Sequence, residues 1–311
     1  MAVNMLKEKS MVQRQVIKNK YFYSLLHSPL FIANVLGIYP AYKSGINIIF
    51  DLGGVLLNID SFALYRQMGF FKLLLYLITT GKNPRALLMS ILNDIDLPDL
   101  PDRGISDECG KPMPKGMIHW FCGTSSCQQI KDSVLRLLDS NPTYCNSFFS
   151  KQLVWSMVRI LFDSQKFSDC VKLNEDAISF VHECMKNKNR LYILSNWDSE
   201  SFSLIKNKYE DFFNLFDGII ISGDFKNAKP DPAIFYYLLK KYDLDIFDTI
   251  FVDDQCENVN AAETIGIHSI LCPKTGRWYQ CQDFDNVRLK LNLWQIERML
   301  EAEKEENPIV L

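Results

Sequence analysis

Short apolar runs that each end in polar residues recur along this chain and constrain its fold more than any other feature. Runs rich in isoleucine, leucine and valine indicate buried strands, and they cover residues 46–50, 190–194, 218–221, 249–252 and 269–271. Segments with helical spacing lie between the later runs. Strands that alternate with helices predict an α/β protein with a parallel sheet covered on both faces. In such sheets ligands bind beyond the carboxyl ends of the strands.

The interval between the first and second runs is far longer than a single crossover connection needs. Apolar residues at helical spacing occupy much of it, whereas 97–114 is rich in proline and glycine and is expected to be a loop. The sequence therefore predicts an α-helical cap inserted into the core. The expected parts are an N-terminal extension, partly helical, at 1–44, the core at 45–62 and 171–282, the cap at 63–170 and a C-terminal helix at 283–311.

The N-terminal extension raises the question of membrane contact. Residues 21–42 lack Asp, Glu, Lys and Arg and follow a basic segment. Serine, histidine, asparagine, glycine and proline interrupt this stretch, so we favour an amphipathic extension packed on the core over membrane contact.

Charge and cysteine usage narrow the expected partners and compartment. A formal net charge of -3 and a pI near 5.9 do not favour nucleic acid as a partner. The nine cysteines are scattered and odd in number, which indicates a reducing compartment, and we expect the cytoplasm. His119, Cys122 and Cys127, with Cys109 upstream, match no common zinc spacing, so packed thiols are favoured there.

Carboxylates follow two of the predicted strands. Asp51 ends the first strand, and Gly53 and Gly54 behind it let backbone approach a ligand. Asp253 and Asp254 end the fourth strand, where their mutual repulsion is costly unless a cation shares the site. Taken alone, Asp51 would be interpreted as a turn residue, and Asp253 and Asp254 as two solvated acids of a loop. Their common position at strand ends favours Asp51 as a nucleophile beside a Mg²⁺ ion that bridges it to the pair.

Donors for a phosphoryl group follow two other segments. Ser195 offers a hydroxyl and neighbouring N–H groups at the end of the second strand. Lys229, just before Pro230, offers a point charge that offsets the acids. In isolation these would be a helix cap and a solvated lysine, and the interpretation rests on all four strand ends meeting.

Four segments together resemble the ordered motifs of the haloacid dehalogenase superfamily. They are 50–56, 193–196, 229–232 and 251–254, the last followed by Asn258, Ala261, Ala262 and Gly266. The resemblance covers residues 46 to 273 and implies a Rossmann-like core whose helical cap follows the first motif. It implies that the cap closes over the site and selects the substrate.

The resemblance also implies the roles of individual residues. The catalytic residues would be Asp51 as nucleophile, Ser195 and Lys229. The substrate's phosphate would be bound by Ser195, Asn196, Lys229 and Gly54. Mg²⁺ would be bound by Asp51, the Gly53 carbonyl, Asp253 and Asp254, with Asp254 favoured over Asp253 as the direct ligand.

Gly53 departs from the usual family pattern. Phosphatases of this family usually carry a second Asp at that position, which protonates the leaving group and then activates water. The loss of such a proton shuttle costs on the order of a hundredfold in rate. Members similar to bacterial glucose-1-phosphate phosphatases share the Asp-x-Gly pattern, and Asp60 is a candidate substitute.

We expect a Mg²⁺-dependent phosphatase that hydrolyses a small phosphorylated metabolite, such as a sugar 1-phosphate, through an aspartyl-phosphate. One alternative is a catalytically weak phosphate-ligand-binding or regulatory protein, which Gly53 suggests. A 2-haloacid dehalogenase is a further alternative, but that reaction needs no metal, and the retained Asp253 and Asp254 argue against it.

Overall fold

The computed structural model describes residues 45–100, 104–105, 111–145, 147–272, 274–275, 281–282 and 284–306. The predictions for the extension at 1–44, and the part of Cys109 in a zinc site, lie outside these residues. No helix in the described part of the chain combines the length and apolarity that crossing a membrane needs.

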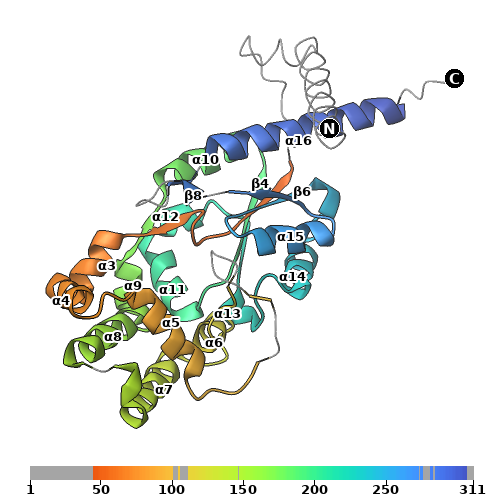
Figure 1. Cartoon of the computed structure of the whole chain (residues 1–311). Helices are drawn as coiled ribbons and strands as arrows, with labels where there is room; N and C mark the ends of the chain where they lie inside the picture. Colours follow the sequence, from red (N-terminus) through yellow and green to blue (C-terminus); the bar gives the residue numbers. More distant parts are fainter. Residues whose placement is uncertain are drawn as a thin grey trace, which may run out of the picture. The chain divides into compact units, whose positions relative to one another are not determined.

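A five-stranded parallel sheet forms the centre of the core (Figure 1). Its order is β5-β4-β1-β6-β7, and each strand is parallel to its neighbours. The strands are β1 (Asn47–Phe50), β4 (Arg190–Ser195), β5 (Gly218–Ile221), β6 (Thr249–Asp253) and β7 (His268–Leu271). The predicted α/β class with a Rossmann-like parallel sheet is confirmed.

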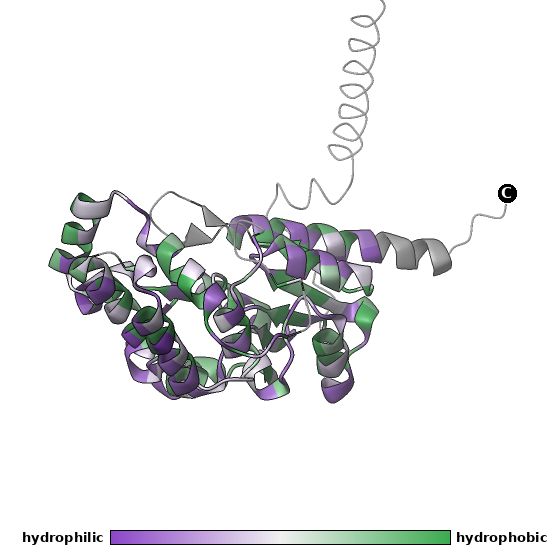
Figure 2. Cartoon of the chain, turned by 60° about the horizontal axis from the view of Figure 1, so that its bottom comes forward, coloured by the Kyte–Doolittle hydropathy of each residue, from purple (hydrophilic) through white to green (hydrophobic). Residues whose placement is uncertain are grey.

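Successive side chains of a strand point to opposite faces of the sheet. Both faces are buried here, because both sets of side chains are apolar and packed into the core. Ile48 and Phe50 belong to one buried cluster, whereas Ile49 belongs to another. The ring of Phe50 packs edge-on against Phe180, with their centroids 6.0 Å apart. Figure 2 shows these strands in the green of hydrophobic residues between the surrounding helices.

The helices that follow β3 cover the sheet. They are α10 (Glu175–Lys186), α11 (Ser199–Lys208), α12 (Glu210–Phe213), α13 (Ser222–Phe225), α14 (Pro232–Tyr242), α15 (Cys256–Thr264) and α16 (Phe284–Glu306). A short 3-10 helix, η2 (Ile246–Asp248), precedes β6, and the strands β8 (Lys274–Thr275) and β9 (Cys281–Gln282) pair antiparallel.

A second group of helices forms a layer of its own. In the sequence it comes between two short strands that pair antiparallel, β2 (Leu57–Ile59) and β3 (Val171–Leu173). Its helices are α3 (Ser61–Met68), α4 (Phe70–Thr80), α5 (Pro84–Asp94), α6 (Lys115–Phe121), α7 (Cys127–Ser140), η1 (Pro142–Tyr144), α8 (Phe148–Leu161) and α9 (Ser164–Asp169). Buried residues of this layer and of the sheet share one apolar cluster. The layer is therefore packed directly on the core.

The stretch 62–80, whose leucines and aromatic residues favour helix, forms two helices. Gly69 lies between them with φ at +84°, and its N–H donates to the Tyr65 carbonyl at 3.1 Å. A positive φ suits glycine and ends the first helix. α4 then starts in a new direction, which sequence periodicity alone does not reveal.

Candidate functional site

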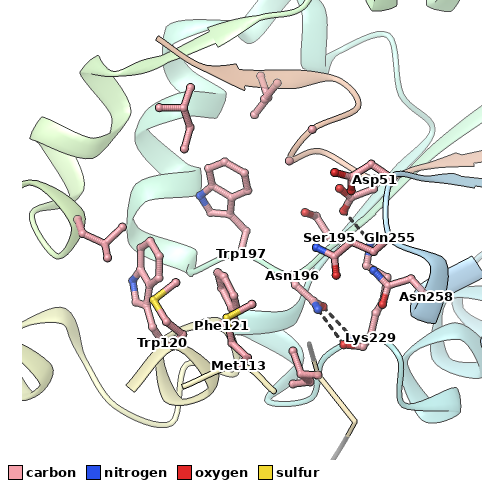
Figure 3. A pocket seen from close by; sticks show the side chains of 18 of the residues that line it. Asp51, Met113, Trp120, Phe121, Ser195, Asn196, Trp197, Lys229, Gln255 and Asn258 are labelled. Carbon is pink, nitrogen blue, oxygen red and sulfur yellow. Dashed lines mark hydrogen bonds and ion pairs between the residues drawn. The ribbon is translucent and has the colours of Figure 1, made fainter. Parts of the chain in front are cut away.

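The carboxyl ends of β1, β4 and β6 meet at one edge of the sheet, where a buried lysine contacts residues at all three ends. The Lys229 ammonium lies 2.6 Å from Asp51 Oδ1 and 2.6 Å from Asp253 Oδ2, and it donates to the Leu194 carbonyl at 2.8 Å. Its side chain is 1% exposed. Figure 3 shows Lys229, Asp51 and Ser195 around this point. The structure thus brings residues from four distant segments into one site.

A pair of backbone bonds fixes Lys229 in this position. The Asn196 amide donates to the Lys229 carbonyl at 2.8 Å, and its side-chain oxygen accepts from the Lys229 N–H at 2.8 Å. Asn196 lines the pocket, as expected of a substrate-binding residue. Its amide is nevertheless engaged with the chain of Lys229, so it also positions that lysine.

The three carboxylates of the site differ in their surroundings. Both oxygens of Asp253 accept from the Asn258 side chain at 3.1 Å, and Oδ1 also accepts from the Gln255 N–H at 2.8 Å. Asp254 lines the open pocket together with Asp51. One oxygen from each of Asp51, Asp253 and Asp254 lies within 4.8 Å of the others.

The electrostatics of the cluster favour a cation. Burial, together with the charge of Asp253, raises the pKa of Asp51 to about 6, although Lys229 and a hydrogen bond from Ser195 lower it. The pKa of Lys229 is raised despite its burial, because Asp253 and Asp51 face it. One ammonium cannot balance three carboxylates. Clustered carboxylate oxygens are the ligands that Mg²⁺ takes, so the side chains fit this ion.

An indole ring occupies the space beside Gly53. A Cβ atom at this position would lie 3.3 Å from Cζ3 of Trp197, closer than the neighbour tolerates without moving. The indole N–H donates to Ser201 Oγ at 2.9 Å, and the Ser201 hydroxyl donates to Asp198. Because this chain of bonds is buried, it holds Trp197 in the place that a side chain at position 53 would enter.

The remaining predicted phosphate-binding residues also lie at the pocket. Ser195 and Gly54 line it beside Asp51. Gly54 has φ at +83°, and its N–H donates to the Leu57 carbonyl at 2.9 Å. This bond shapes the loop after β1, so the N–H of Gly54 is already engaged.

Two side chains considered from the sequence have other functions in the structure. Asp60 is the N-cap of α3, where it accepts from the N–H groups of Phe62 and Ala63 at 3.0 Å. These bonds lower the pKa of Asp60, led by the one from Ala63, which is the wrong direction for a proton donor. His119 donates through Nε2 to the Pro98 carbonyl at 2.9 Å. In the described residues, metal-ligating side chains gather instead around Asp51.

The side of the pocket opposite the charged cluster is apolar. The pocket holds about 240 Å³, and its apolar wall runs from Met113, Met117, Trp120, Phe121 and Phe167 to Trp197 beside Gly53. Figure 3 shows Met113, Trp120 and Phe121 across the pocket from Asp51 and Lys229. This wall was not predicted from the sequence, although four of its residues recur at three-to-four spacing around α6. Such a stripe is more often simply part of a core.

Comparisons with known proteins find chains that are similar in sequence or fold. Residues 47–266 match the family model described as haloacid dehalogenase-like hydrolase. A drimenol cyclase from Aspergillus calidoustus is 34% identical over 109 residues, which cover 34% of this chain and 20% of the relative. A sesquiterpene phosphatase from Aspergillus oryzae is 31% identical over 98 residues, which cover 32% of this chain and 50% of the relative.

The chain spans half or less of the length of these two relatives. Among solved structures, a HAD family enzyme from Bacteroides thetaiotaomicron is 18% identical, with a TM-score of 0.46, and the match covers 76% of this chain and 97% of that one.

Proposed function

The chain belongs to the haloacid dehalogenase-like hydrolases, and from this membership we propose that it is a Mg²⁺-dependent phosphatase of a small phosphorylated metabolite. The observation that carries the proposal is the buried contact of Lys229 with Asp51 and Asp253 beside Asp254. Phosphoryl transfer to a carboxylate needs a nucleophilic oxygen, positive charge for the phosphoryl oxygens and a cation site, and these residues provide all three.

In the proposed reaction an oxygen of Asp51 attacks phosphorus, and the bond from phosphorus to the ester oxygen breaks. The alcohol leaves and takes its proton from solvent. Water then attacks phosphorus, the bond to Asp51 breaks, and inorganic phosphate is released with a free carboxylate. Lys229 and Ser195 hold the phosphoryl oxygens while charge shifts among them.

The side chains of Asp51 and Asp254 and the carbonyl of Gly53 would hold Mg²⁺ in this proposal. When bound, the ion neutralises the charge between the carboxylates and the phosphoryl group. Asp253 has a different part, because its oxygens are engaged with Lys229 and Asn258. It fixes the lysine and contributes its negative charge to the cation site.

The surroundings of Gly53 restrict the leaving group. Because position 53 is a glycine with the Trp197 ring beside it, no carboxyl group there can protonate the alcohol. The alcohol must therefore depart with little protonation, as a sugar 1-phosphate or another good leaving group can. The apolar wall supports a substrate whose organic part is at least partly apolar. One of the relatives is named a sesquiterpene phosphatase, which supports the same choice.

We further propose that residues 63–170 form the cap, since they contain most of this apolar wall. The free cysteines among the described residues support a reducing compartment, the cytoplasm.

The test uses the full chain, Mg²⁺ and a panel of phosphate esters that differ in the size and polarity of the alcohol. Asp51→Asn should lower turnover on the order of a thousandfold or more, because the nucleophilic oxygen is replaced. Asp60→Asn is the matched control, because Asp60 is the N-cap of α3 and does not line the pocket, and it should retain turnover. Equal turnover by Asp51→Asn and the parent would refute the nucleophile.

A further inference from the structure

Helices α3 and α4 expose an unusually apolar surface. In the described part of the chain seventeen large hydrophobic residues are exposed, and eight of them lie on these two short helices. We call them the α3–α4 surface: Phe62, Tyr65, Phe70, Phe71, Leu74, Leu75, Leu77 and Ile78. Single exposed apolar residues need no explanation, but a contiguous group marks a surface that binds something.

The same helices are fixed to the protein on their other side. Tyr76 of α4 is 1% exposed and belongs to the main apolar cluster. The Lys72 ammonium donates to Ser156 Oγ of α8 at 3.2 Å. The outward residues therefore stand on a supported helix, with Phe71 at 77% and Ile78 at 72% exposure. α3 and α4 lie at the edge of the helical layer in Figure 1.

The segment that contains α3 and α4 carries basic residues but no acidic ones. Residues 61–93 contain no Asp or Glu, but they contain four exposed basic residues, Arg66, Lys72, Lys82 and Arg85. The chain as a whole has a formal net charge of -3. The segment with the exposed phenylalanines and leucines thus has a formal charge of +4, which Asp60 at the start of α3 lowers to +3, whereas the chain as a whole is negative.

This charge selects the class of partner. A symmetric contact with a second copy of the chain would place the same four cations against this surface. Residues 1–44 carry six Lys or Arg and one Glu, so their charge does not complement this surface. A partner must combine negative charge with an apolar interior, and a bilayer of anionic lipid does both.

We propose that the α3–α4 surface binds an anionic membrane surface. The phenylalanines and leucines enter the boundary between headgroups and acyl chains, and the exposed Arg66 and Lys82 face lipid phosphates. α4 has 11 residues, about 16 Å of helix, so it lies in the interface and does not cross the bilayer. Arg85 and Met89 of the adjacent α5 line the pocket of Asp51, which places the entrance of that pocket close to the membrane.

The test is co-flotation of the full chain with vesicles of phosphatidylcholine, either alone or mixed with phosphatidylserine. We expect binding to the mixed vesicles that weakens as salt is raised. Phe71→Ser should lower the partition coefficient about tenfold, from the loss of one buried phenylalanine. Lys82→Gln should lower it about fivefold on the mixed vesicles.

The matched control is Phe247→Ser, because Phe247 is 74% exposed but lies on η2 of the core. It should bind like the parent. Undiminished binding by Phe71→Ser would assign any membrane contact to residues 1–44 and overturn the proposal. Two other results would overturn it as well. One is that the chain binds no vesicles but forms a dimer that Phe71→Ser dissociates. The other is that the α3–α4 surface binds an acidic protein and does not bind lipid. Vesicle binding needs no turnover, so this test is separate from that of Asp51.

Discussion

Replacement of Lys229 by Met removes the one cation that lies between two buried carboxylates. The side chain of Lys229 is 1% exposed, and its ammonium lies 2.6 Å from both Asp51 and Asp253. Removal of one partner from a buried ion pair typically costs about 3–5 kcal/mol, because the other charge stays buried without compensation. We expect Lys229→Met to lower the free energy of unfolding by about that amount at neutral pH without Mg²⁺.

The loss should depend on pH. In the parent, burial raises the pKa of Asp51 to about 6 from an ordinary value of 3.8, while Lys229 lowers it. Without the lysine this pKa rises further. A carboxyl group whose pKa is raised by folding destabilises the fold as pH rises through that pKa. The deficit of Lys229→Met should therefore shrink in acid, where Asp51 is protonated, and grow toward neutral pH.

Mg²⁺ should reverse part of the loss, because it supplies positive charge to the same carboxylates. At a concentration one hundred times its dissociation constant, a ligand of the folded state adds about 2.7 kcal/mol. Urea denaturation with and without Mg²⁺ measures both effects. The control is Lys208→Met, because the Lys208 ammonium donates only to the carbonyls of Ser168 and Val171 in the bonds seen here. A loss of Lys229→Met no larger than that of Lys208→Met, without pH dependence, would refute this reasoning.

Three further predictions concern the pocket. Gly53→Asp should lower the free energy of unfolding by about 1–3 kcal/mol, because the new side chain is crowded against Trp197. A double-mutant cycle with Trp197→Ala should show a coupling of about 1 kcal/mol, and additive effects of the two changes would contradict the contact. Turnover, as kcat/KM, should rise steeply with the acidity of the leaving alcohol, and a flat dependence would reveal another proton donor. Mg²⁺ affinity measured by calorimetry should weaken as pH falls through about 6, because a proton on Asp51, whose pKa is raised mainly by burial, competes with the ion; constant affinity over that range would contradict it.

The sheet was predictable from sequence because strands buried on both faces read as continuous apolar runs. β1 and β6 are such strands, and the acids that follow them had to meet at one edge of the sheet. The strands β2 and β3 were not predicted, because three residues are too few for a periodic pattern. The break at Gly69 was also missed, since helical spacing continues on both sides of it.

The contacts around Gly53 could not be predicted without knowledge of the fold. Trp197 and Gly53 are far apart in the sequence and come from the loops after β4 and β1, so only tertiary contacts reveal that the indole fills this space. The same holds for Phe121, whose carbonyl accepts from the Ser222 hydroxyl at 2.5 Å and so ties the helical layer to the core. Sequence spacing indicates which residues end a strand, but not which neighbours fill the space beside them.

The most direct test of the central claim is to stop turnover with acid and map the phosphate on peptides of the full chain. The account predicts phosphate covalently attached to the peptide that contains Asp51 during turnover with Mg²⁺, and none on the same peptide of Asp51→Asn. Phosphate release by the parent with a covalent phosphate on a different residue, or with none at all, would contradict it.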